Sequence, residues 1–274
     1  MEQGKEINIR DDAATASLGL SPALCVFILI AGCMIAFAQP LFAQSTVFRT
    51  KKSASSTWNP VLALTIGTGV EFESSDDEKK TAFPLLLDYN FTQRLRVTAE
   101  SAFAFADSKD PEIGKIKGLE DLETSIEYEA IRERRYTPAL TALGLVKWAT
   151  ASDEDLGSTG TDYSVGLIAS KDFVFFEVDS NVLYTSSGDP EAPNLVEASL
   201  AVAYPLNHFF DLHAEVVRTV GTGGPARGAA NETEATVGFS WQMTPFQSLE
   251  SGFLRKNDGT WGVLVGWQYS FGGD

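Results

Sequence analysis

Histidine is the side chain that most often supplies acid–base or metal chemistry near neutral pH, and this sequence contains two, His208 and His213. They stand five residues apart on one predicted strand, so they point to opposite faces and cannot share a metal ion. No Ser and His motif of a hydrolase accompanies them. The sequence therefore predicts no catalytic residue, no metal site and no cofactor.

Two other kinds of segment could bind ions. The Gly-rich stretches 157–160 and 221–224 are not followed by a helical pattern or by the Lys-Ser/Thr pair that a phosphate-binding loop needs, so we expect hairpin loops there. The acidic stretches 74–78 and 152–155 lack the spacing of a calcium loop. We expect both to be solvated surface.

Carboxylates are the polar groups whose spacing suggests a shared environment, because they recur on the polar side of alternating segments. A confined set of carboxylates attracts cations and raises carboxylate pKa values through mutual repulsion. The alternative is that these charges only solvate a water-filled interior. We predict an interior that disfavours anions, with Arg96 and Lys147 as its bases, lined by Glu123, Glu127, Glu177, Asp179, Glu197, Asp211, His213, Glu215, Arg96 and Lys147.

The elements that carry these residues alternate with period two, which is typical of strands. In 261–271 the odd positions hold Trp, Val, Val, Trp, Tyr and Phe, while the even positions hold Gly, Leu, Gly, Gln and Ser. Such a strand has one face suited to lipid. About twelve segments of this kind are predicted, at 61–73, 80–90, 94–107, 119–131, 138–150, 161–171, 173–186, 195–205, 208–221, 232–243, 246–256 and 261–271.

The connections are expected to alternate between tight turns and polar loops. Tight turns are predicted at 91–94, 171–172, 205–207 and 244–245. Polar loops are predicted at 74–80, 107–118, 151–160, 186–194 and 221–231. An even number of strands places both termini on one side, the periplasmic side if the strands cross an outer membrane.

The fold class that fits is all-β, a closed antiparallel transmembrane β-barrel, because only closure satisfies every backbone polar group in lipid. No run after the first forty-odd residues reaches the roughly 20 apolar residues of a membrane-spanning helix. A soluble sandwich or lipocalin-like barrel is the alternative. Placement of Trp241, Trp261, Trp267, Tyr204 and Tyr269 near strand ends favours interfacial girdles instead.

The N-terminal region resembles an export signal. An apolar run over 18–43 ends in Leu41-Phe42-Ala43, and cleavage after Ala43 is preferred over cleavage after Ala38. A permanent anchor is one alternative, and a lipidated Cys33 after Ile30-Ala31-Gly32 is another. The predicted organisation is a signal peptide over 1–43, a short periplasmic segment over 44–60 and a barrel over 61–271.

Both cysteines, Cys25 and Cys33, fall in this leader, so the exported chain is expected to contain no thiol and no disulfide. The formal net charge of −16 argues against nucleic acid as a partner. The final Tyr269-Ser270-Phe271 is similar to the signal that the barrel-insertion machinery reads. Outer-membrane lipids, lipopolysaccharide, that machinery and a small-molecule solute are the expected partners.

Several short motifs resemble the outer-membrane transporters grouped under the "MetA pathway of phenol degradation". The resemblance covers about 118–271 and implies a small barrel in the cell outer membrane that passes small aromatic or hydrophobic compounds. One departure is Ala149-Thr150-Ala151, where the family often has Pro-Thr-Gly, so this loop is expected to differ in shape. The motifs are 118–122 (Gly-Leu-Glu-Asp-Leu) with Tyr128, 138–140, 160–163, and 170–173 (Ser-Lys-Asp-Phe) with Asn181 and Tyr184.

The sequence therefore predicts an outer-membrane channel or transporter for small molecules. A structural or surface-interaction barrel is the alternative, with acidic loops that contact lipopolysaccharide through divalent cations or bind a partner protein.

Overall fold

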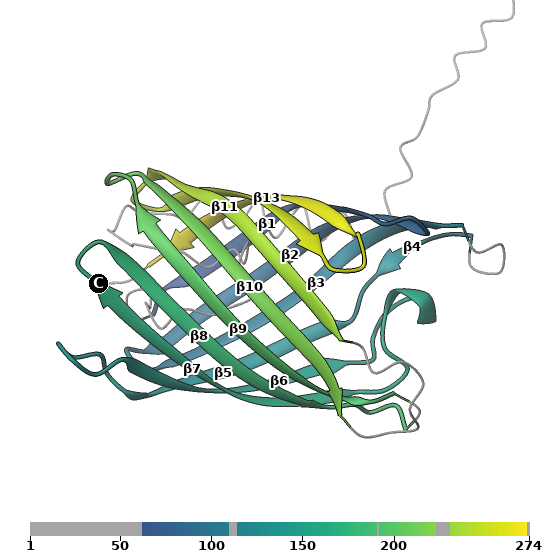
Figure 1. Ribbon diagram of the computed structural model, residues 1–274, viewed down its shortest axis with the longest axis horizontal. Helices are drawn as coiled ribbons and strands as arrows, with labels where there is room; N and C mark the ends of the chain where they lie inside the picture. The colour runs from purple at the N-terminus through teal and green to yellow at the C-terminus, as the bar shows by residue number, and fades with distance from the viewer. Residues whose placement is uncertain (1–61, 110–113, 191, 223–230, 273–274) are drawn as a thin grey trace, which may run out of the picture. The chain divides into compact units, whose positions relative to one another are not determined.

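The computed structural model describes residues 62–109, 114–190, 192–222 and 231–272, and these residues form one antiparallel β-barrel (Figure 1). The predicted leader and the segment 44–60 lie outside the described residues. The strands are β1 (Leu64–Ser74), β2 (Glu78–Thr92), β3 (Leu95–Ser108), β4 (Lys115–Leu119), β5 (Leu122–Ile131), β6 (Ala139–Trp148), β7 (Asp162–Phe173), β8 (Phe176–Ser186), β9 (Asn194–Pro205), β10 (Phe210–Thr222), β11 (Glu232–Thr244), β12 (Gln247–Lys256) and β13 (Trp261–Phe271).

The sheet closes on itself because β1 pairs with both β2 and β13. Leu64 lies opposite Phe271 and Ser74 opposite Trp261, so the first and last strands are in register over their full length. The other strands pair antiparallel with their neighbours in sequence, except that β4 and β5 both pair with β3 and not with each other. Closure removes the free edges, as the alternation predicts.

Twelve positions make up the wall, although thirteen strands are defined. The reason is that β4 and β5 share one position in the wall. β4 pairs with residues 103–107 of β3, and β5 pairs with residues 95–100 of the same strand. Between them, Glu120 and Asp121 interrupt the ladder and shift the alternation by one residue. The predicted twelve-stranded antiparallel barrel is confirmed.

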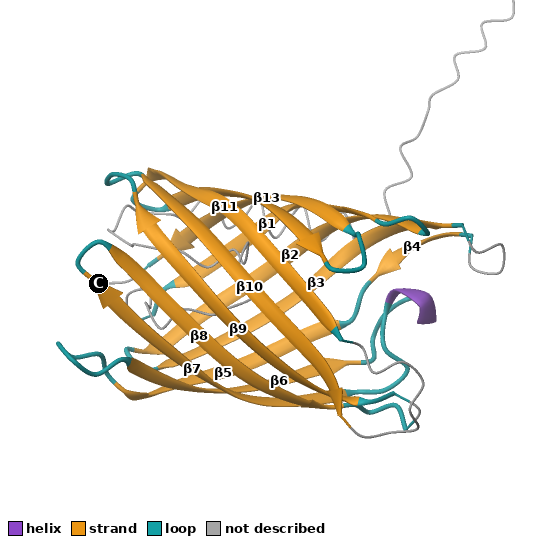
Figure 2. Ribbon diagram, viewed as in Figure 1, coloured by secondary structure: helices purple, strands orange, loops and turns teal. Residues whose placement is uncertain are grey.

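The connections fall into two sets at opposite ends of the barrel. One end, here called the short-turn end, carries 93–94, 132–138, 174–175, 206–209 and 245–246. The other, here called the loop end, carries the connections β1–β2 (75–77), β3–β4, β6–β7 (149–161), β8–β9, β10–β11 and β12–β13 (257–260). Figure 2 shows the short 3-10 helix η1 (Glu154–Leu156) beside β4 at the loop end.

Three predicted connections are wrong. The predicted loop over 107–118 is too long, because β3 continues to Ser108 and Lys115–Leu119 forms β4 against it. Lys171 and Asp172 do not form a turn: β7 continues to Phe173, which pairs with Phe176, and the turn is 174–175. These two polar residues stay in the ladder because Glu133 accepts hydrogen bonds from the Lys171 amino group and from the Asp172 amide.

The predicted loop over 74–80 is likewise only 75–77, because the Ser75 amide donates to the Glu78 carbonyl over 2.8 Å and closes a tight hairpin. The predicted strand over 208–221 begins two residues late, at Phe210. His208 therefore lies in the turn, where Asn207 Oδ1 accepts hydrogen bonds from the Phe209 and Phe210 amides.

The two faces of the wall differ as the alternation predicts. On β13, Val265 is 43% exposed whereas Gln268 and Ser270 are each 1% exposed. Because the barrel is closed, the shielded face is its interior, so polar side chains point inwards and apolar side chains outwards. Exposed outward side chains from around the wall include Phe83, Phe103, Ile126, Val165, Leu167, Val182, Leu200, Val216, Val237 and Phe253.

Aromatic rings gather at both ends of the outer face. At the short-turn end, Trp241 stacks on Phe210 with ring centroids 5.6 Å apart. At the loop end, Trp261 contacts Phe72 at 5.4 Å. Such bands are typical of side chains at the two membrane interfaces.

Candidate functional site

Inward-facing side chains form two groups along the barrel. Towards the short-turn end lies a set of buried charged and polar residues. Towards the loop end, a cavity of about 610 Å³ opens between β2, β3, β5, β6, β7, β8 and β9. The two groups differ in how freely their charges are exposed to water.

Arg96 is the central charge of the buried group. Its side chain is 4% exposed, and those of Asp88 and Glu127 are 0% exposed. The guanidinium Nε lies 3.6 Å from Asp88 Oδ2, and the other side of the group donates to Glu127 Oε2. Since these residues come from three adjacent wall positions, β2, β3 and β5, the ion pairs tie the first strands together.

Further hydrogen bonds join neighbouring strands at the same end. Ser170 Oγ donates to Asp179 Oδ1 over 2.6 Å, and Gln268 Nε2 donates to Glu250 Oε1 over 3.3 Å. His213 lies opposite Gly238, where an added Cβ would stand 2.3 Å from His213 Nε2. The glycine therefore makes room for the imidazole.

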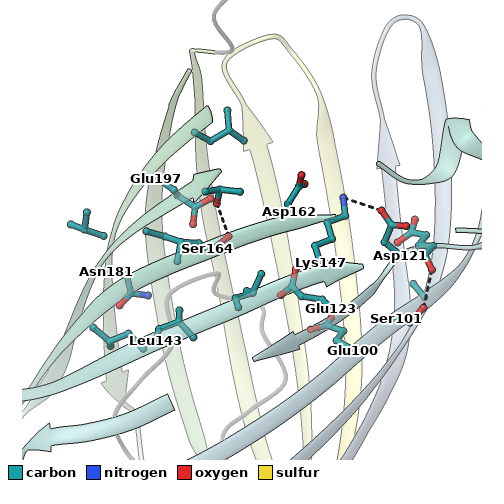
Figure 3. Close-up of a pocket in the computed structure, with 18 of the residues that line it drawn as sticks. Glu100, Ser101, Asp121, Glu123, Leu143, Lys147, Asp162, Ser164, Asn181 and Glu197 are labelled. Atoms are coloured by element: carbon teal, nitrogen blue, oxygen red, sulfur yellow. Dashed lines mark hydrogen bonds and ion pairs between the residues drawn. The ribbon is translucent and has the colours of Figure 1, made fainter. Parts of the chain in front are cut away.

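The cavity at the loop end carries an excess of acidic groups. Figure 3 shows Glu100, Glu123, Asp162 and Glu197 around it, with Lys147 directed towards Asp121. Two ion pairs balance part of this charge. They join Lys80 Nζ to Glu120 Oε1 at 2.5 Å and Lys147 Nζ to Asp121 Oδ2 at 3.6 Å. The remaining carboxylates give the cavity a negative potential.

One wall of the cavity is apolar, on β6, β7, β8 and β9. Gly166 on β7 leaves space for Leu183, since a Cβ at this glycine would lie 2.8 Å from Leu183 Cδ1 and 2.7 Å from the Val182 carbonyl oxygen. The cavity is thus lined by both acidic and apolar side chains. The inward apolar side chains of this wall are Leu143, Leu145, Ile168, Leu183 and Leu195.

The ten residues predicted to line the interior occupy three places. Glu123, Lys147 and Glu197 line the cavity, and Glu123 lies opposite Lys147 in the register. A second set is buried nearer the short-turn end, and the third is half-buried close to the turns. The second set is Arg96, Glu127, Asp179, His213 and Glu215, and the third is Glu177 and Asp211. Their part in solute passage stays a prediction.

Arg96 and Lys147 face the interior as expected, but the expectation that they are its only bases is wrong. Lys80 also lines the cavity. Lys256 Nζ on β12 lies 3.6 Å from Glu232 on the adjacent β11 and 3.6 Å from Glu73 on β1, which is two strands away. Both lysines sit at strand ends beside loops, where alternation is hard to follow because the first strand residue is not fixed by sequence.

Asp121 is the residue of the site that alternation could not indicate. Its carboxylate accepts from the amides of Thr150 and Ala151, each over 2.9 Å, and from the amide and hydroxyl of Ser158 over 2.6 and 2.7 Å. Asp121 thereby binds both ends of a segment in the β6–β7 loop. A buried carboxylate with this many donors is held in its charged form.

Burial alone would raise the pKa of Asp121, but the hydrogen bonds from Ser158, Ala151 and Thr150 outweigh it and hold this pKa below its ordinary value. The loop contacts made by the carboxylate are therefore complete above the ordinary aspartate pKa. They are lost only as the pH falls through the lowered value.

Within the ranges that the structure describes, no group of three or more His, Cys, Asp or Glu side chains is arranged to hold a metal ion. None of the helical segments in those ranges has both the length and the hydropathy of a transmembrane crossing.

The fold is that of outer-membrane β-barrel channels and porins. The chain is similar to the COG4313 outer membrane channel from Pseudomonas putida F1, at 17% identity and a TM-score of 0.65, over 82% of this chain and 100% of that one. It is also similar to the NanC porin, at 14% identity and a TM-score of 0.57, over 74% and 98%.

A third similar structure is the KdgM porin in complex with disordered oligogalacturonate, at 13% identity and a TM-score of 0.53, over 76% of this chain and 99% of that one. No protein-family model and no curated protein matches the sequence. At these identities the likeness establishes the fold.

Proposed function

We propose that this chain is an outer-membrane channel for small solutes with a preference for cations. The observation that carries the proposal is the acidic cavity at the loop end, enclosed by a barrel whose outer face is apolar. A closed barrel in lipid offers solutes no other polar route than its interior.

Support for a cation preference comes from the balance of charges in the cavity. Lys80 and Lys147 are each paired with an acid, Glu120 and Asp121, whereas the cavity holds further carboxylates. A cation entering from the loop end meets this negative potential before it meets Arg96.

The apolar wall of the cavity favours solutes that have a hydrophobic or aromatic part, in line with the resemblance to the "MetA pathway of phenol degradation" transporters. One similar structure is described as an outer membrane channel and two as porins. A cavity with an apolar wall and a few fixed charges is the usual form of a small-molecule site.

Export is part of the same proposal. Residues 1–43 act as a cleaved signal peptide, residues 44–60 lie in the periplasm, and the barrel is inserted by the barrel-insertion machinery among outer-membrane lipids and lipopolysaccharide. The chain acts without a catalytic residue or cofactor. This part is tested by fractionating the outer membrane and comparing the gel mobility of the folded protein with that of the unfolded protein.

Liposome swelling tests the transport role. Vesicles that contain the protein are expected to take up a small organic cation several times faster than an anion of equal size. Neutralising Glu123 and Glu197 together as Gln should reduce this ratio, by about threefold for each charge removed. The matched control is Asp107→Asn, an exposed carboxylate of β3 that does not line the cavity.

A ratio unchanged by the double substitution would contradict the cation preference. Absence of uptake of any solute, together with a folded heat-modifiable barrel, would instead favour a structural or surface-interaction role. In that role the acidic loops would contact lipopolysaccharide through divalent cations or bind a partner protein.

A further inference from the structure

The β6–β7 loop is bonded to the barrel wall at both of its ends, in part through its own backbone. The Ser152 amide donates to the Leu119 carbonyl over 2.9 Å, and the Leu119 amide donates to Ser152 Oγ over 2.8 Å. With the four hydrogen bonds to Asp121, both ends of the segment 150–158 are fixed at the break between β4 and β5.

Between these two attachments the loop turns into the barrel. The helix η1 begins after Asp153, whose side chain accepts from the Asp155 amide. At its end, the Leu156 side chain packs against Ala82, Ala102 and Ala104, three inward-facing alanines that are at most 9% exposed. Leu156 also lines the cavity, as does Asp121.

The wall is shaped to receive this loop. Alanines on the inward face of β2 and β3 leave the volume that Leu156 occupies. Two glycines leave the rest: a Cβ at Gly118 would lie 1.8 Å from Ser152 Oγ, and a Cβ at Gly157 would lie 2.7 Å from Asp121 Oδ1. The fit of small residues to one inserted side chain indicates a defined position for the loop.

We propose that residues 150–158 form a constriction across the outer end of the cavity, that Asp121 holds it in place, and that Leu156 limits the size of the solutes admitted. This inference rests on the proposed channel function and names the element that sets its size limit. Glu123, Glu197 and the apolar wall then contact only those solutes that pass Leu156.

Chemical labelling and conductance test the constriction together. In the full chain carrying Cys25→Ser and Cys33→Ser, a cysteine is introduced as Leu156→Cys and reacted with a membrane-impermeant maleimide. Adding Asp121→Ala should raise the labelling rate about tenfold or more, because several hydrogen bonds to a charged group are lost. Asp121→Ala without the cysteine should raise single-channel conductance and the largest sugar taken up by liposomes.

Asp258→Ala is the matched control. Asp258 also holds a loop at the same end, accepting from the Thr260 amide over 2.8 Å, but it does not line the cavity. It should leave labelling, conductance and size limit unchanged. Labelling of Leu156→Cys that is equally fast with and without Asp121→Ala would overturn the inference.

A reversible lock separates loss of the loop contact from a damaged barrel. An added Cβ at Gly118 would lie 3.2 Å from Ser152 Cβ, a few tenths of an ångström less than the roughly 3.5–4.5 Å of a disulfide, so a small shift of the loop would allow the bond. Gly118→Cys with Ser152→Cys, added to Asp121→Ala, should therefore return conductance towards the parent value on oxidation and raise it again on reduction.

The outcomes distinguish the two proposals. Equal conductance in the parent and Asp121→Ala overturns the constriction and leaves the channel intact. Absence of conductance in every variant overturns the channel function, and the constriction with it.

Discussion

Replacing Arg96 by alanine is expected to lower the free energy of unfolding by about 3–5 kcal/mol, because the two buried carboxylates beside it lose the cation they share. Asp88 and Glu127 are fully shielded from solvent, so water cannot screen their repulsion. The measurement is the urea concentration at which the folded, heat-modifiable gel band is lost in detergent. The midpoint should fall well below that of the unsubstituted chain.

Two comparisons make this test specific. Arg218→Ala removes an exposed arginine that donates to Thr233 Oγ1, and it should change the unfolding free energy by no more than about 0.5 kcal/mol. Arg96→Met combined with Asp88→Asn and Glu127→Gln removes all three charges and should recover most of the loss. Equal midpoints for Arg96→Ala and Arg218→Ala would show that the cluster contributes nothing.

The second large effect concerns two neighbours on β8 that point to opposite faces. Val182 is 54% exposed near the middle of the strand and lies opposite Leu167, which is 64% exposed, whereas Asn181 is half-buried and lies opposite Ile168, which is 0% exposed. An arginine facing lipid near the bilayer midplane costs about 2–4 kcal/mol. Val182→Arg should therefore lose this much stability when the barrel folds into vesicles, and Asn181→Arg should lose much less.

Folding equilibria in lipid vesicles, followed by gel mobility against denaturant, measure both variants under one condition. Because both variants introduce the same side chain at adjacent positions, the cost of its size cancels. The difference in stability between them then reports whether the side chain faces lipid or the barrel interior. If Asn181→Arg were the more damaging of the two, the assignment of the lipid-facing side would be reversed.

The faces of the wall could be predicted from sequence because alternation acts over one strand at a time. Val265 and Gln268 illustrate this, since the parity of β13 alone places one against lipid and the other inside. Strand ends were harder to predict. Lys171 and Asp172 look like turn residues locally, but a contact with Glu133, which is distant in sequence, keeps them in β7.

The cavity could be predicted only in part. Glu123, Lys147 and Glu197 follow from parity, but Asp121 does not, because its role depends on donors 29 to 37 residues away in sequence. Leu156 is hidden in an acidic loop that reads as solvated surface. A signal was present in β3, where Phe103 and Phe105 alternate with Ala102 and Ala104: small residues on the inner face mark space that another segment fills.

The most direct test of a wet, acidic interior is the reversal potential of the protein in a planar bilayer under a gradient of potassium chloride. We expect a potential displaced towards the value for potassium, and a smaller displacement after Glu123→Gln with Glu197→Gln. A potential near zero, or one displaced towards the value for chloride, would contradict it.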